Sequence, residues 1–587
     1  MSPVISMKIF SEQHKSDQHA FWQHKVLPFF TLLAMECALL LLDAVIPLSG
    51  LNATFRDALL TQLGAWPLLP TLLLFPHWAV IPALRDAHGP AHLINFGSWV
   101  ATVMLFGVLI VIFLIYVLAL RRLPRNVGRR YIVYSTLLLG ITCALIPVVT
   151  SPDLYSYIAY ARIGVIYHLN PLTTLPTAIR SDPVFSHVDW INQPSAYGPT
   201  WIAITCFLQW VTLAFGMKVI VPMVLSLRLL GLAMHLGSTL LIWSIGGYLQ
   251  RQYGSVSAER RVLATLAFAW NPLLLFEACV NAHNDATILF LILLCIWFLV
   301  RCPLQTQLWN LLAAAVVFAI ATCLKLNVLL LVPGLLIFLW VQRPRNILRI
   351  ATPIVVYLGI IMLLYAPFWQ NGAYLKVFLI NPVATRNINS LPDFMANLYN
   401  SIVATLGYPM APSSGSPAEL VTHILSIGIF VIIYGLVCWR AMRAPHRVST
   451  LPRLIRWLAL VWLLYCLIGS PWYWPWYIVT FFGLYALIEA TNAGEQRFLG
   501  FLRFPRAARL LAFSMLTLYC FYAFGLGTFP GLVGLSWGSL SGLWIWIVPL
   551  CARFKPELPA VGKIKTESDV VEHVEKQEIQ EDRVRVG

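Results

Sequence analysis

The stretch that decides the fold is Ser98–Arg130, which reads SWVATVMLFGVLIVIFLIYVLALRRLPRNVGRR. Its first part, 98–120, carries no charged residue. A helix crosses the hydrocarbon core of a bilayer with about 20 apolar residues, so this run is long enough to span it. Arginines crowd the second part, 121–130, and basic residues in short loops stay on the cytoplasmic side. The stretch therefore predicts a transmembrane helix that ends in the cytoplasm.

The composition of the whole chain agrees with this interpretation. Of its 587 residues, 59% are hydrophobic and 11% are charged, and the mean hydropathy is +0.76. Soluble domains carry about 25% charged residues, which excludes a soluble globular protein. The formal net charge is +16, but Lys and Arg gather in short loops between apolar runs. We therefore expect the lipid bilayer, with its anionic surface, as the partner of this charge, and no nucleic acid.

Apolar runs recur along the chain and predict an all-α polytopic membrane protein, with about 13–15 transmembrane helices. The candidate spans are 26–48, 98–120, 131–149, 200–216, 219–247, 262–280, 285–301, 309–324, 328–341, 350–369, 419–439, 456–469, 475–490, 508–527 and 538–552. They form a multi-span domain, 26–552, between a cytoplasmic N-terminus, 1–25, and a disordered, charged cytoplasmic tail, 553–587. We expect a multi-pass protein of the plasma membrane with both termini in the cytoplasm.

The basic loops also assign the sides of the membrane. With 121–130 inside, Asp153 lies outside. The long loops expected on that side are 49–97, 150–199 and 370–418. Arginines after residue 250 break the alternation unless the run 200–216 does not cross fully, so we expect a partial or re-entrant segment there. The run 64–84 contains four prolines and is expected to be a surface or re-entrant element.

Asp153 is the first candidate for chemistry, because it places a carboxylate where a span meets a polar loop. The sequence Ser151-Pro152-Asp153 also suits the start of a helix, with Ser as the N-cap and an acid in the first turn. Tyr157 and Tyr160 follow Asp153 at helical spacing and share its face. Aromatic hydroxyls beside a carboxylate suit a sugar-binding cleft, and they equally suit an interfacial anchor.

A second polar cluster, Asn281-Ala282-His283-Asn284-Asp285, lies between two apolar runs. Unpaired polar groups are costly at membrane depth, so the cluster indicates a cavity or the outer interface, unless it is a plain polar turn. His283 and Asp285 could supply metal ligands, but nothing else in the sequence completes a site. No cofactor is therefore predicted, and a divalent metal stays possible without support. Eleven scattered cysteines without a CxxC pair indicate neither a zinc site nor a disulfide framework.

Two cations and one aromatic run complete the set of candidates. Lys325 lies between two short apolar runs, where its ammonium can meet a phosphate or extend from a helix end towards water. Arg386 lies in the 370–418 loop and offers bidentate phosphate contact, unless it is simply solvated. The run Pro471–Tyr477, with Trp472 and Tyr473, suits a stacking platform for a sugar or polyprenyl chain, or an aromatic belt.

The order of these motifs resembles a known family. An acid-Tyr helix follows a span, then comes the turn Leu169-Asn170-Pro171, then Tyr197-Gly198-Pro199 opens a helix. The Asn-x-His-Asn-Asp cluster and Lys325 come later. This order, over roughly residues 100 to 480, is similar to the GT-C glycosyltransferases, particularly the bacterial polyprenol-phosphate-mannose-dependent α-(1→6)-mannosyltransferases.

The resemblance implies a membrane glycosyltransferase that moves a hexose, with mannose expected, from a polyprenyl-phosphate sugar to a glycan or glycolipid acceptor on the outer face. Asp153 then maps onto the family's catalytic base, and the transfer is inverting. Substrate contacts are expected from Tyr157, Tyr160, Asn170, Tyr197, His283, Asn284, Asp285, Lys325, Arg386, Trp472 and Tyr473. The alternative is a transporter or flippase, or a polymerase, of lipid-linked saccharides.

Overall fold

The charge-free run 98–120 forms most of α6 (Ala91–Arg122), and the basic residues after it lead into α7 (Arg129–Leu145). α6 begins at residue 91, so part of the loop expected over 49–97 is helical. The computed structural model describes residues 26–45, 91–146, 151, 153–218, 220–253, 257–301, 308–342, 347–376, 381, 385–408, 415–491, 497–498, 502–523, 535 and 538–553. The expected N-terminal segment 1–25, the run 64–84 and the tail from 554 lie outside these residues.

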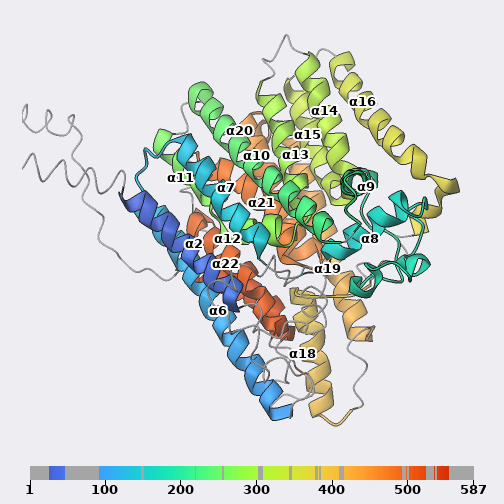
Figure 1. The fold of residues 1–587 in the computed structure, drawn as a ribbon. Coiled ribbons are helices and arrows are strands. Elements are labelled where there is room, and N and C mark those ends of the chain that lie inside the picture. The colour runs from blue at the N-terminus through green and yellow to red at the C-terminus, as the bar shows by residue number, and fades with distance from the viewer. Residues whose placement is uncertain are drawn as a thin grey trace, which may run out of the picture.

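Helices dominate the described part of the chain, and the all-α polytopic prediction is confirmed (Figure 1). The N-terminal helices pack against each other and against a late helix: α2 (Leu27–Val45), α6, α7 and α22 (Phe504–Ala523). The central helices are α10 (Val221–Tyr253), α11 (Ala258–Ala269), α12 (Pro272–Leu275), α13 (Asp285–Val300) and α21 (Val479–Glu489). A buried hydrogen bond joins this group to α7, where the Trp270 indole donates to Ser135 Oγ over 2.9 Å.

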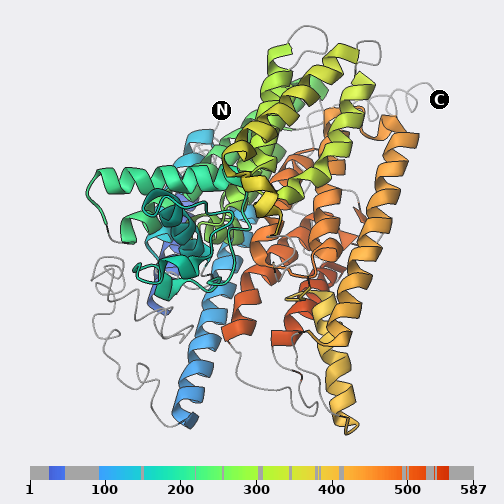
Figure 2. The same ribbon diagram turned by 90° about the vertical axis from the view of Figure 1, so that its right-hand side faces the viewer.

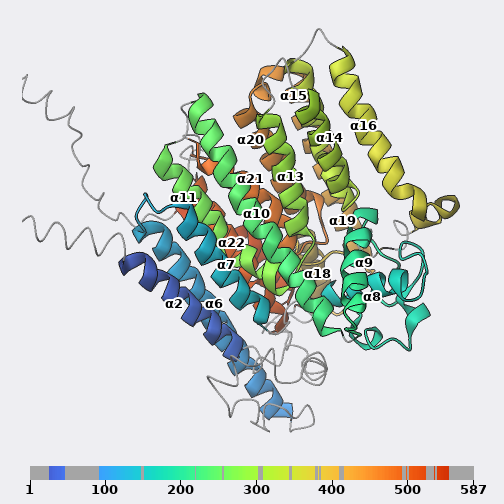
Figure 3. The same ribbon diagram turned by 45° about the horizontal axis from the view of Figure 1, so that its top comes forward.

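A third group of helices covers the other side of α13: α14 (Leu308–Thr322), α15 (Val332–Gln342), α16 (Ile347–Tyr365), α19 (Pro417–Arg443) and α20 (Leu451–Leu464). Figure 3 shows α13, α14, α15 and α16 side by side. The remaining helices are α8 (Asp153–Val165), α9 (Pro199–Ala214), α18 (Leu391–Thr405) and α23 (Ser541–Leu550). Two short strands among the described residues, β1 (Arg497–Phe498) and β2 (Leu502–Arg503), pair antiparallel.

Short 3-10 and π segments join or end several helices. They are η5 (Pro176–Ile179), η6 (Phe185–His187), η7 (Phe276–Val280), η8 (Leu326–Leu331), η9 (Ala366–Phe368), η10 (Gln370–Lys376), η12 (Pro445–Arg447), η13 (Tyr465–Gly469), η14 (Pro475–Ile478), η16 (Gly538–Leu540) and η17 (Cys551–Arg553). Figure 2 shows the teal segment from α8 to α9 beside the bundle, near the ends of the yellow-green helices. This segment corresponds to the loop expected over 150–199.

Five helices among the described residues are long and apolar enough to cross a membrane: Val103–Arg122, Pro222–Tyr253, Ile347–Phe368, Pro417–Arg443 and Leu451–Gly469. A sixth crossing is possible where Ala258–Ala269 and Pro272–Val280 meet at a bend of 46°. Seven shorter apolar helices accompany them, so the total number of crossings stays a prediction. α9 is among the short ones, with 16 residues, and whether it crosses is likewise untested.

The structure differs from the sequence predictions for the span 262–280 and for the loop 370–418. The span expected over 262–280 is broken, because Asn271 caps a new helix through a hydrogen bond from the Leu273 N–H, and Pro272 occupies its first position. The loop expected over 370–418 contains α18, whose N-cap is Ser390. The sides assigned to the loops stay predictions.

The crossing of α10 over the π segment η7 gives a test of the packing. An ideal Cβ on Gly231 would lie 1.8 Å from the Ala278 carbonyl oxygen, whereas a Cβ on Gly428 in α19 meets nothing within 4 Å. We expect Gly231→Ala to lower the stability by about 1–3 kcal/mol, because the backbones must separate. Gly428→Ala should be neutral or slightly stabilising. Thermal unfolding in detergent measures both, and equal melting temperatures for the two variants would contradict this packing.

Candidate active site

Asp153 begins α8, and its side chain lines a cavity although it is buried. The Asp153 N–H donates to Ser151 Oγ over 3.3 Å, which fixes the start of the helix. The Trp190 indole N–H donates to Asp153 Oδ1 over 3.2 Å, and the Tyr197 hydroxyl donates to Oδ2 over 3.1 Å. Each carboxylate oxygen therefore has one donor, and each keeps a lone pair that can accept a proton.

The protonation of Asp153 reflects two opposing effects. Burial raises the pKa of its carboxyl above the ordinary value of 3.8, because the charged form loses hydration. The hydrogen bonds from Trp190 and Tyr197 and the positive charge of Lys325 act in the opposite direction and stabilise the carboxylate. A carboxylate with a raised pKa is a better proton acceptor than an ordinary one.

The cavity beside Asp153 has a volume of about 310 Å³. This is near the lower end of the range for small-molecule sites, which is about 300–1,000 Å³. Its lining is mostly polar and aromatic and comes from distant segments: Ser151, Asp153, Tyr160, Asp189, Trp190, Gln193, Pro194, Ala196, Tyr197, Lys325, Leu326, Asn327, Asn381, Tyr465, Trp472, Trp474, Trp476 and Tyr477. A carboxylate, an ammonium and several indoles therefore face one space.

Lys325 supplies the ammonium. Its Nζ lies 3.1 Å from both carboxylate oxygens of Asp285, which is fully buried at the start of α13. The same Nζ lies 4.1 Å above the ring of Tyr477, a cation–π contact. These contacts hold the ammonium at the edge of the cavity, where it is still partly exposed.

A close backbone contact brings Lys325 towards Tyr197. The Gly198 N–H donates to the Leu324 carbonyl over 3.1 Å, and the Thr200 N–H donates to the Cys323 carbonyl over 3.2 Å. A Cβ on Gly198 would lie 2.0 Å from the Cys323 oxygen, so a side chain there would push the two segments apart. The Tyr-Gly-Pro motif thus joins the start of α9 to the end of α14.

The Asn-x-His-Asn-Asp cluster forms the layer behind the cavity. Its backbone leaves the π segment η7 and passes through a positive φ of 53° at Ala282. The His283 ring stacks on Trp476 with centroids 3.8 Å apart, and its Nδ1 lies 3.4 Å from the Tyr157 hydroxyl. Its Nε2 lies 3.5 Å from Glu277. Burial and the charge of Lys325 lower the pKa of His283, so the imidazole is neutral and positions its aromatic neighbours.

Indoles form the opposite wall of the cavity. Trp474 and Trp476 stack almost in parallel, at 7° and 5.1 Å, and Trp190 contacts Trp472 at 5.8 Å. The backbone of Ile388 pairs with the run 471–477. The Ile388 N–H donates to the Pro471 carbonyl, and the Ile388 carbonyl accepts from the Tyr473 N–H, both over 2.9 Å. The wall is therefore fixed by the segment that precedes α18.

Residues 77–342 match the family model described as alpha-(1->6)-mannopyranosyltransferase, N-terminal domain. Over these residues the chain is therefore similar to this family. The resemblance seen in the motif order is thereby confirmed. No curated protein matches the chain. No solved structure matches it either.

The matched part of the chain contains Asp153, Tyr197, His283, Asp285 and Lys325, whereas Trp472, Trp474 and Trp476 of the indole wall lie beyond it. The family match supports an alpha-mannosyltransferase, and the apolar helices indicate a membrane protein. The donor, the acceptor and the side of the membrane are not part of this assignment.

The structure sorts the residues predicted from the sequence into three groups. Those that line the cavity are Asp153, Tyr160, Tyr197, Lys325 and Trp472. Those buried behind its wall or beside the second polar cluster are Tyr157, His283, Asn284, Asp285 and Tyr473. The other two lie apart. The Asn170 amide donates to the Phe368 carbonyl and accepts from the Leu172 N–H of its own turn. Arg386 is exposed. Within the described residues, no group of three His, Cys, Asp or Glu could hold a metal ion.

Three important residues were not among the sequence candidates. Trp190 and Asp189 lie in the long polar segment after α8, where nothing in the local pattern distinguishes them. Glu277 is buried and bonded to Asn281 over 3.2 Å. It offered a usable signal, because a carboxylate inside an apolar run indicates a functional or paired group.

The Lys325–Asp285 pair can be tested through stability. We expect Lys325→Met to lower the stability of the protein by about 3 kcal/mol, because it leaves a buried carboxylate without its counter-ion. Adding Asp285→Asn should restore most of the loss, since the unpaired charge is then gone. Arg386→Met, at an exposed cation, serves as the control and should change stability by less than about 0.5 kcal/mol. If the double variant melts no higher than Lys325→Met in detergent, the pairing is wrong.

Proposed function

We propose that the protein transfers mannose from a polyprenyl-phosphate carrier to a hydroxyl of a glycan or glycolipid acceptor, on the outer face of the membrane and with inversion. One observation carries this proposal: the carboxylate of Asp153 and the ammonium of Lys325 line the same cavity. The reaction needs a base for the acceptor and a hydrogen-bond donor for the leaving phosphate. The cavity offers both: Asp153 is its buried carboxylate and Lys325 supplies the ammonium.

Asp153 acts as the general base. The acceptor hydroxyl attacks the anomeric carbon of the donor sugar while the carboxylate takes its proton. The bond between the anomeric carbon and the phosphate oxygen breaks, and its electron pair leaves with the polyprenyl phosphate. Attack from the face opposite the leaving group inverts the anomeric centre. The departing phosphate is a stable anion, so a strong general acid is not required.

Lys325 faces the leaving phosphate. Asp285 neutralises much of its charge, so the ammonium contributes a directed N–H donor more than a net positive field. Fixed donors of this kind stabilise developing charge without reorganising during the reaction. The Tyr477 ring and the Asp285 carboxylate hold the ammonium in place.

The walls of the cavity suit a hexose. Sugars present apolar faces that stack on aromatic rings, and the indoles of Trp190, Trp472, Trp474 and Trp476 face the same space as the base. A volume of about 310 Å³ leaves room for a single sugar and its phosphate. The family match supports a transferase over a flippase or polymerase of lipid-linked saccharides.

A direct test compares the two carboxylates that line the cavity. Asp153→Asn should reduce the transfer of labelled mannose from polyprenyl-phosphate-mannose by about 10²–10⁴-fold, the usual contribution of a general base. Asp189 lies at the exposed rim, so Asp189→Asn should lose far less. The assay uses membranes with matched amounts of each variant. Full activity of Asp153→Asn would remove this residue as the base, and a larger loss in Asp189→Asn would transfer the role to that residue.

A pH profile tests the environment of Asp153. The base works deprotonated, so kcat/KM should fall as the pH drops through its raised pKa, above the ordinary 3.8. Trp190→Phe removes a donor that favours the carboxylate, which raises the pKa further and moves the acid limb to higher pH. Tyr160→Phe is the control, because that hydroxyl donates to the Gln193 carbonyl. An acid limb that stays in place in Trp190→Phe would contradict the assignment.

A further inference from the structure

We infer that a second, apolar cavity binds the first part of the hydrocarbon tail of the donor, an inference that rests on the proposed function. This cavity has a volume of about 280 Å³ and lies between α13, α14, α15 and α16. Its lining residues are Cys295, Leu299, Leu311, Ala314, Ala315, Phe318, Val332, Leu335, Leu336, Leu339, Pro353, Ile354, Tyr357 and Leu358. The Tyr357 hydroxyl and the Cys295 thiol are the polar side-chain groups among them.

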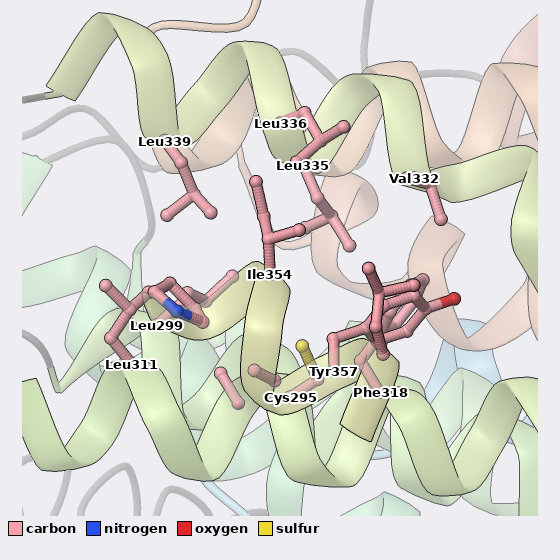
Figure 4. Close-up of a pocket in the computed structure, with 14 residues that line it drawn as sticks. Cys295, Leu299, Leu311, Phe318, Val332, Leu335, Leu336, Leu339, Ile354 and Tyr357 are labelled. Atoms are coloured by element: carbon pink, nitrogen blue, oxygen red, sulfur yellow. The ribbon is translucent and has the colours of Figure 1, made fainter. Parts of the chain in front are cut away.

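The shape of the cavity suits a chain. Figure 4 shows Val332, Phe318 and Tyr357 towards one end and Leu339, Leu299 and Leu311 towards the other. A dry apolar cavity of about 150 Å³ accepts a molecule the size of benzene. A volume of about 280 Å³ therefore holds roughly two groups of five or six carbons, the length of two isoprene units.

Two segments of the chain run from the wall of the apolar cavity to the active site. α14 carries Phe318 and ends at Thr322, and Lys325 follows three residues later. The segment Leu326–Gln342 also connects the two spaces: Asn327 lines the active-site cavity, and Val332 lines the apolar one. A donor whose phosphate meets Lys325 can thus lay the start of its tail between these helices.

The cavity also has a route to the bilayer. Leu336 and Leu358 line it and are 38% and 47% exposed, and the apolar window of α16 is mostly exposed as well. In a membrane these surfaces face lipid, so a prenyl chain can enter sideways. A single hydrocarbon chain with a phosphate head fits an apolar cavity whose wall is connected by short segments to the ammonium of Lys325.

The energetic role of such a site differs from that of a pocket in water. Lipid tails are as apolar as leucine side chains, so a tail gains little hydrophobic free energy when it moves from the bilayer into the protein. What the cavity supplies is close packing and a defined direction for the head group. Blocking it should therefore weaken donor binding moderately and leave the chemical step intact.

The test narrows the cavity and varies the donor. Ala314→Phe on α14 and Leu335→Trp on α15 fill the space from two sides. Val355→Phe adds comparable bulk to a position on α16 that is 67% exposed and serves as the control. Mannose transfer is measured with a long polyprenyl-phosphate-mannose and with a single-isoprene phosphate-mannose. We expect the filled variants to raise KM about tenfold for the long donor and less than about twofold for the short one.

The possible outcomes separate the two proposals. If a filled variant changes KM equally for both donors, or for neither, the tail binds elsewhere while the proposed function stands. If it lowers the melting temperature and kcat with both donors alike, the cavity holds a structural bilayer lipid, which overturns the inference. If wild-type protein transfers mannose from neither donor, the proposed function fails, and this inference fails with it.

Discussion

The contact between Gly198 and the Cys323–Leu324 peptide is the constraint on which the site depends. It brings the start of α9 against the end of α14, and so places Tyr197 and Lys325 on one cavity. Tyr197 in turn holds Asp153 through its hydroxyl. One backbone approach, available to glycine, therefore links the candidate base to the candidate phosphate partner.

The broken helices around the cavity follow from the same requirement. Backbone that leaves a helix at membrane depth must find other partners, which is tolerated where it is buried in protein or lines a cavity. The break at Asn271, the π segment before His283 and the extended backbone at Lys325 all occur where polar side chains gather. One pair of these polar residues is the ion pair of Asp285 with Lys325.

Much of the fold could be predicted from the sequence, because apolar length and charge placement act locally. Local patterns of this kind predicted the long apolar helix before Arg121, the membrane class and the start of a helix at Tyr197-Gly198-Pro199. The site could be predicted in part. Asp153 and Lys325 were recognisable from the order of motifs, whereas Trp190 depends on a contact across 37 positions that no local pattern encodes. Asn170 and Arg386 show the converse: residues of suitable chemistry that the fold uses in a turn or leaves exposed.

The central claim is that Asp153 and Lys325 face a single bound donor from opposite sides. An experimentally determined structure with polyprenyl phosphate, the proposed product, tests this most directly. The account predicts the phosphate within hydrogen-bond distance of Lys325 Nζ, about 2.7–3.2 Å, with Asp153 across the space where the sugar would lie. A phosphate bound elsewhere in the bundle, with no contact to Lys325, would contradict it.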